Sequence, residues 1–172
     1  MIDNQKESKM GDIDRNCIEK MIAHHKIANV MADIALKEAE HSEIKQIASE
    51  IKRDEIEDML KMREIFKSYG MDISLPKLDE ARKILQSQDL LQDPADIARL
   101  KHAKPFDKAF LEEMVPHHQM AIKMSKNILN NSSNQDLRLI AESIIKKENH
   151  EIDQMKDWYQ EWYGQPLVEN NK

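Results

Sequence analysis

Two short segments combine the side chains best suited to chemistry. Each reads Met-x-x-His-His, over residues 21–25 and 114–118. Residues three apart on a helix lie on one face, so the methionine of each segment shares a face with the first histidine. Thioether and imidazole form a soft ligand set that favours Cu(I), and by the same softness Ag(I), whereas histidine alone also accepts Cu(II) or Zn(II). The two segments therefore predict metal-binding sites.

The two segments are related by an offset of 93 residues. The same offset, without a gap, aligns further residues over two helix lengths, among them Ile51 with Ile144, Glu55 with Glu148 and Met62 with Met155. A gapless register of this length indicates a duplicated unit. We predict a single domain over residues 1–172, with internal repeats at 13–70 and 106–163 and a connector at 71–105.

Each repeat has the pattern of a helical hairpin. Apolar residues recur at i, i+3 and i+4 in two stretches, separated by the polar connections KEAEHSE and NNSSNQD. Asp14 and Asp107 are the predicted N-cap residues of the first helices. Two such hairpins bury their apolar faces by forming an antiparallel four-helix bundle, so we expect an all-α fold. The connector contains one more helical pattern, over residues 79–91, and is expected to form a partly helical crossover.

Glu55 and Glu148 lie on the apolar stripes of the second helices, where an unpaired carboxylate is costly. They are expected either to ligate a metal or to fix the imidazole tautomer by hydrogen bonding. The second repeat also has Met120, three residues after His117, and Pro116, which removes a helical hydrogen bond. The candidate metal ligands are Met21, His24, His25, Met31, Glu55, Met62, Met114, His117, His118, Met120, Met124, Glu148 and Met155.

The composition excludes several classes of partner. The net charge is −6, so no basic field attracts nucleic acid. No apolar run approaches the roughly 20 residues that a membrane span needs. The first residues are polar and show no signal peptide, so the chain is expected to be either cytosolic or a mature form from which a signal has been removed. Cys17 is the single cysteine, which rules out an internal disulfide.

Two other interpretations stay open beside metal binding without turnover. Methionine is usually core filler, and a histidine on an apolar face is often a hydrogen-bonded core residue, so the chain could be a structural or partner-binding bundle. A ferritin-like di-iron enzyme would need Glu-x-x-His on two helices. The chain has one such pair, Glu38 and His41, near a predicted loop. The leading hypothesis is therefore a metal-binding protein that is not an enzyme.

The stretch from FDKAFLEEMVPHHQM to ENHEIDQMKDWY resembles the bacterial family known as domain of unknown function 305. The second repeat carries its whole signature, and the first carries a looser version in which Asp58 and Met59 replace Glu151 and Ile152. The resemblance implies a ferritin-like fold and an exported protein that binds copper through Met and His, for tolerance, storage, buffering or delivery to a partner protein. It implies a periplasmic or secreted location and favours the second repeat as the better site.

Overall fold

The computed structural model describes residues 9–86 and 97–168. Within these ranges the chain forms helices and no strand, which confirms the all-α prediction. The helices are α1 (Asp12–Glu38), α2 (Ser42–Ser68), α3 (Leu78–Gln86), α4 (Ile97–His102), α5 (Phe106–Asn131) and α6 (Gln135–Tyr163).

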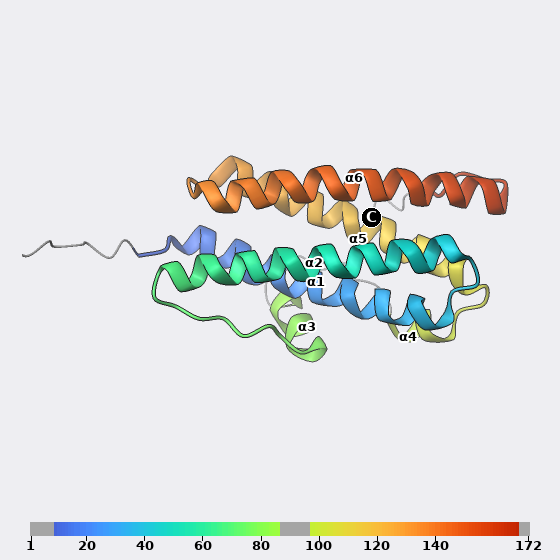
Figure 1. The fold of residues 1–172 in the computed structure, drawn as a ribbon, viewed down its shortest axis with the longest axis horizontal. Coiled ribbons are helices and arrows are strands. Elements are labelled where there is room, and N and C mark those ends of the chain that lie inside the picture. The colour runs from blue at the N-terminus through green and yellow to red at the C-terminus, as the bar shows by residue number, and fades with distance from the viewer. Residues whose placement is uncertain (1–8, 87–96, 169–172) are drawn as a thin grey trace, which may run out of the picture.

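The four long helices form an antiparallel bundle (Figure 1). Short turns join α1 to α2 at one end of the bundle and α5 to α6 at the other. Helix α1 packs against α2 and α5, and α6 packs against α5 and, more loosely, α2. Helices α1 and α5 are the two that carry a His-His pair, and they lie side by side with opposite directions. Each pair is therefore presented to the other across the interior.

Local interactions define both ends of α6. The side chain of Asn134 accepts a hydrogen bond from the backbone N–H of Leu137 at 2.9 Å, which caps the first turn. Gly164 adopts a φ of 68° after the last turn, a conformation that glycine accepts without steric cost. The polar connection before α6 is thus a loop with a built-in cap.

The prediction that Asp14 and Asp107 are N-cap residues is wrong. Helix α1 begins at Asp12 and α5 at Phe106, so both aspartates lie inside the first turn. Asp107 is buried and instead serves the facing turn between α1 and α2. Its carboxylate accepts the backbone N–H groups of Glu40 and His41, at 3.0 and 2.7 Å, and contacts Nδ1 of His41 at 2.6 Å. This residue therefore ties the two hairpins together.

The connector covers the outside of the α1–α5 side of the bundle. Helix α3 packs on α1, and α4 packs on α5 and α1. The helix predicted over residues 79–91 is observed as α3 as far as Gln86, and the rest of that stretch lies outside the described residues. The partly helical crossover is confirmed for the described part of the connector.

Candidate metal centre

Polar side chains are buried at mid-length in each of the four long helices. We call this set the polar layer: His24, His25, Glu55, Asp58, His117, His118, Glu148 and Glu151, each between 0 and 8% exposed. Two apolar clusters lie on either side of it along the bundle, one around Met21 and one around Met114. Burying so many polar groups costs free energy unless each finds a partner or a ligand.

The imidazole rings of His24 and His117 stack at the contact between α1 and α5. Their centroids are 3.6 Å apart and the planes differ by 27°. Among the described residues, no hydrogen-bond partner is found for either nitrogen of either ring. Burial lowers the pKa of His24 to about 3, and burial with the neighbouring histidines lowers the pKa of His117 well below its usual value. Both rings are therefore neutral near pH 7, the form of imidazole that binds metal.

The second histidine of α1 faces two glutamates. His25, Glu55 and Glu148 each offer one ligand atom, and these three atoms all lie within 4.8 Å of one another. Five atoms of these side chains make no hydrogen bond to any residue in the described part of the chain. They are both nitrogens of His25, both carboxylate oxygens of Glu55 and Oε2 of Glu148. Burial, and then repulsion between the glutamates, raises the pKa of Glu55 well above its usual value. Burial likewise raises the pKa of Glu148 to about 8.

The equivalent histidine of α5 is held differently. His118 Nε2 lies 2.8 Å from Oε2 of Glu151, whereas His25 Nε2 is 4.0 Å from Oδ2 of Asp58. Burial disfavours a charge on His118, but the attraction of Glu148 and Glu151 outweighs it and raises the pKa of the ring. Asp58 is instead engaged by Lys147, whose Nζ donates to Oδ2 at 2.8 Å. The position equivalent to Lys147 in the first repeat, 93 residues earlier, is Asp54. The first repeat therefore has no lysine at that position to pair with Glu151, the equivalent of Asp58.

The candidate methionines divide between the two apolar clusters, and each cluster draws on both repeats. Met21, Met62 and Met124 belong to one cluster, and Met31, Met114 and Met155 to the other. All six are at most 9% exposed. The predicted ligands of one repeat are therefore not gathered in one place, because Met31 and Met124 lie ten residues along their helices from Met21 and Met114. The antiparallel packing of α1 on α5 then brings methionines of both repeats into each cluster.

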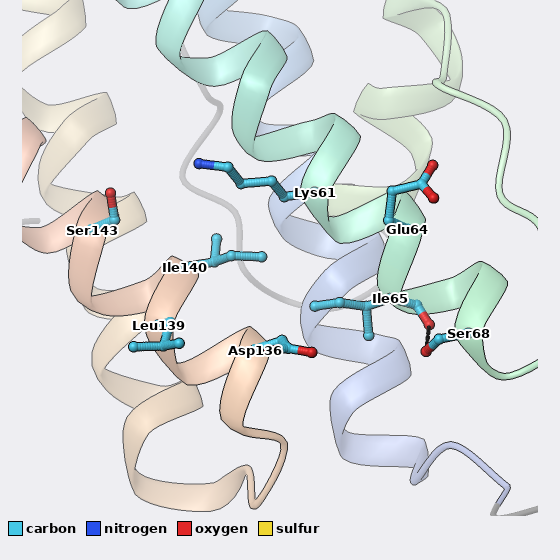
Figure 2. A pocket seen from close by; sticks show the side chains of 8 residues that line it. All are labelled: Lys61, Glu64, Ile65, Ser68, Asp136, Leu139, Ile140 and Ser143. Atoms are coloured by element: carbon cyan, nitrogen blue, oxygen red, sulfur yellow. Dashed lines mark hydrogen bonds between the residues drawn. The ribbon is translucent and has the colours of Figure 1, made fainter.

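The surface grooves lie apart from the polar layer. A groove of about 440 Å³ between α2 and α6 is lined by Lys61, Glu64, Ile65, Ser68, Asp136, Leu139, Ile140 and Ser143, none of which is a candidate ligand (Figure 2). A second groove, of about 270 Å³, is lined by Cys17, Lys20, Met120, Lys123, Met124, Asn127 and Ile128. Two candidate ligands, Met120 and Met124, line this second groove, and Met120 is partly buried there. The candidate centre is therefore internal.

Three members of the arrangement were not among the predicted ligands: Asp58, Glu151 and Lys147. A signal for the two carboxylates was present, because each follows a buried glutamate by three residues and so shares its helix face. Lys147 gave no such signal. Its role depends on a long side chain that reaches from α6 to α2, and the sequence does not show which residue it reaches.

Solved structures resemble the whole bundle. CopM in the Cu(I)-bound form is 34% identical, with a TM-score of 0.73, over 88% of this chain and 98% of that one. The Ag-bound form from co-crystallization and the Cu(II)-bound form of CopM match with TM-scores of 0.73 and 0.69. A secreted-type DUF305 protein from Streptomyces coelicolor is 18% identical, with a TM-score of 0.75 over 93% of this chain and 98% of that one, and shows the fold alone.

A shorter similarity involves uncharacterized protein L153 of Acanthamoeba polyphaga mimivirus. It is 43% identical over 49 residues, which span 28% of this chain and 32% of that protein. The family match is far more extensive, because it runs over residues 14–170 and so includes α2, α5, α6 and all but the first two residues of α1. The chain therefore belongs to the family described as domain of unknown function (DUF305).

Proposed function

We propose that this chain binds copper as Cu(I), with Ag(I) as a mimic, and serves copper storage, buffering or delivery rather than turnover. The observation that carries the proposal is its similarity to CopM, which has Cu(I)-bound and Ag-bound structures, over 88% of the chain. The polar layer supports it independently. A purely structural bundle would pair its buried imidazoles, whereas His24 and His117 lack hydrogen bonds to any described residue.

The ligands that we assign to Cu(I) are the stacked imidazoles of His24 and His117 with the thioethers of Met21 and Met114. Each methionine lies one turn before its histidine on the same helix, and both are fully buried. Met31, Met62, Met124 and Met155 lie farther along the bundle, in the two apolar clusters, and are not assigned to this site. An apolar, water-poor surrounding suits a monovalent ion better than a divalent one, because moving a single charge out of water costs less free energy. Soft sulfur donors select Cu(I) over hard cations.

The biological role in this proposal comes from the family resemblance. It comprises copper tolerance, an exported location and handover to a partner protein. Among the described residues, none of the helices is long and apolar enough to cross a membrane. The rival di-iron enzyme finds less support in the geometry, because His41 lies in the turn after α1 and contacts Asp107 rather than the polar layer.

The test is a titration of the metal-free protein with Cu(I) or Ag(I) against a competing chelator. We expect tight uptake that is lost when His24, His25, His117 and His118 are all replaced by alanine. If this variant stays folded and binds as well as the parent chain, the assignment to the polar layer is wrong. Uptake of iron with oxygen consumption would favour the di-iron enzyme instead.

A further inference from the structure

The side chains of His25, Glu55 and Glu148 form a cluster whose chemistry differs from that of the stacked histidines. Three separate helices, α1, α2 and α6, supply one side chain each. One nitrogen and two carboxylate oxygens lie within 4.8 Å of one another, close enough to converge on one ion after small movements. The three residues are at most 4% exposed, so bulk water does not satisfy them.

The donor set argues for a divalent cation. A metal ligand must be deprotonated, so Glu55 and Glu148 would release their protons on binding. The two carboxylates then bring two negative charges, which a dication neutralises and a monocation does not. Carboxylate oxygen and imidazole nitrogen together suit Zn(II) and Cu(II), whereas Cu(I) prefers sulfur. The ligand atoms are also unused: five of the six nitrogen and oxygen atoms in this cluster have no hydrogen bond to any residue that the structure describes. Unpaired buried donors of this kind are expected where a ligand normally completes the site.

The neighbouring groups explain why the site forms on one side of the polar layer. Near His118, Glu151 reaches the ring at 2.8 Å and occupies its Nε2. Near His25, the shorter Asp58 stops at 4.0 Å and is held by Lys147. The ion pair keeps Asp58 away from His25, and it leaves both nitrogens of that ring unpaired. Lys147 is therefore a positioning residue that leaves His25 open to a ligand.

We propose that His25, Glu55 and Glu148 form a site for one divalent cation, Zn(II) or Cu(II), separate from the Cu(I) site, and that Lys147 restrains its affinity by holding Asp58. The site goes beyond the proposed copper(I) function. Its ligands are oxygen-rich and come from both repeats, so a chain without Cu(I) affinity would still display it.

Equilibrium dialysis of the full chain against Zn(II) tests the ligands. We expect one Zn(II) per chain, with affinity reduced at least about tenfold in Glu55→Gln and in Glu148→Gln. Glu142→Gln, an exposed residue of the same helix α6, is the matched control and should bind as the parent does. Ag(I) affinity should be unchanged in all three variants. If both Gln variants fold and keep the Zn(II) affinity of the parent chain, the proposed site is wrong. It is also wrong if their Ag(I) affinity falls together with their Zn(II) affinity, because one shared site would then hold both ions.

A second measurement needs no variant. The electron paramagnetic resonance spectrum of the parent chain with one equivalent of Cu(II) should show a single coordinated imidazole nitrogen with oxygen donors. Coupling to two or more imidazole nitrogens would overturn the assignment, because His24, His117 or His118 would then be ligands.

The positioning role is tested by Lys147→Met. Release of Asp58, 4.0 Å from His25, supplies a further carboxylate and removes a nearby positive charge, so we expect Zn(II) to bind at least about tenfold more tightly. Lys146→Met, at an exposed neighbouring position, is the control. An unchanged or weakened Zn(II) affinity in Lys147→Met would show that Lys147 does not restrain the site.

Discussion

The rings of His24 and His117 lie face to face with centroids 3.6 Å apart, although 93 residues separate them in the chain. The stack joins the two hairpins at the middle of the bundle. Two equivalent sites, one for each repeat, would keep these residues apart. For the Cu(I) binding that we propose, their contact predicts one shared site.

A shared site predicts non-additive effects. His24→Ala and His117→Ala should each lower Ag(I) affinity strongly, and the double variant should be little worse than either single variant, because each change already breaks the same site. Chelator-competition titration of the three variants measures this. Two independent losses that add in the double variant would point to separate sites.

The thioethers can be tested with little effect on packing. Leucine has nearly the volume of methionine, so Met21→Leu and Met114→Leu should cost less than about 1.5 kcal/mol of stability each. We expect Ag(I) affinity to fall in both, since a ligand atom is lost. Met59→Leu is the control, because Met59 is buried in the same cluster as Met21 but has isoleucine at the position 93 residues later. Equal losses in all three would assign the effect to packing.

The metal-free protein should lose stability as pH rises above neutrality. The pKa of Glu148 is about 8 in the fold and near 4.5 when unfolded, so the native state keeps a proton that the unfolded chain releases. Stability from this group is complete below pH 4.5 and is lost as pH rises to about 8, with a slope of at most about 1.4 kcal/mol per pH unit. His24 acts oppositely but only below pH 6.5.

The window from pH 6.5 to 8 excludes the opposing effect of His24, while the raised pKa values of Glu55 and His118 act in the same direction as that of Glu148. Urea unfolding of metal-free Glu148→Gln should show a clearly shallower decline there than the parent chain, whereas Glu142→Gln should follow the parent. Parallel curves for parent and Glu148→Gln would contradict the raised pKa.

Asp107→Ala should destabilise the bundle by about 1–3 kcal/mol, because it leaves the N–H groups of Glu40 and His41 without their acceptor. Thermal unfolding checks this as a lower Tm. Asp14→Ala changes the position 93 residues earlier, which is less buried, and should have a much smaller effect. Similar losses in the two variants would show that the link to the facing turn contributes little.

The helices and their antiparallel arrangement could be predicted because apolar spacing determines which face of each helix is buried. The His-His pairs, Glu55 and Glu148 were also found from the sequence, since polar residues on an apolar stripe stand out. That these glutamates lie near a histidine was expected, but the particular pairings were not predicted. Which histidine contacts which depends on how α1 crosses α5. Asp107 could accept N–H groups of its own helix, as an N-cap, or those of the facing turn, and the sequence alone does not distinguish the two. The duplication itself, and the ligand roles, stay predictions.

The polar layer makes the fold sensitive to its contents. For the ion binding that we propose, an ion that binds the folded chain would stabilise it by an amount that grows with the logarithm of its concentration. Backbone amides at mid-helix should then exchange with solvent faster in the metal-free protein than in the loaded one. In a cell, the metal-free form would be the one that opens and is degraded first. The amount of this protein would thus follow the metal supply without any change in its synthesis.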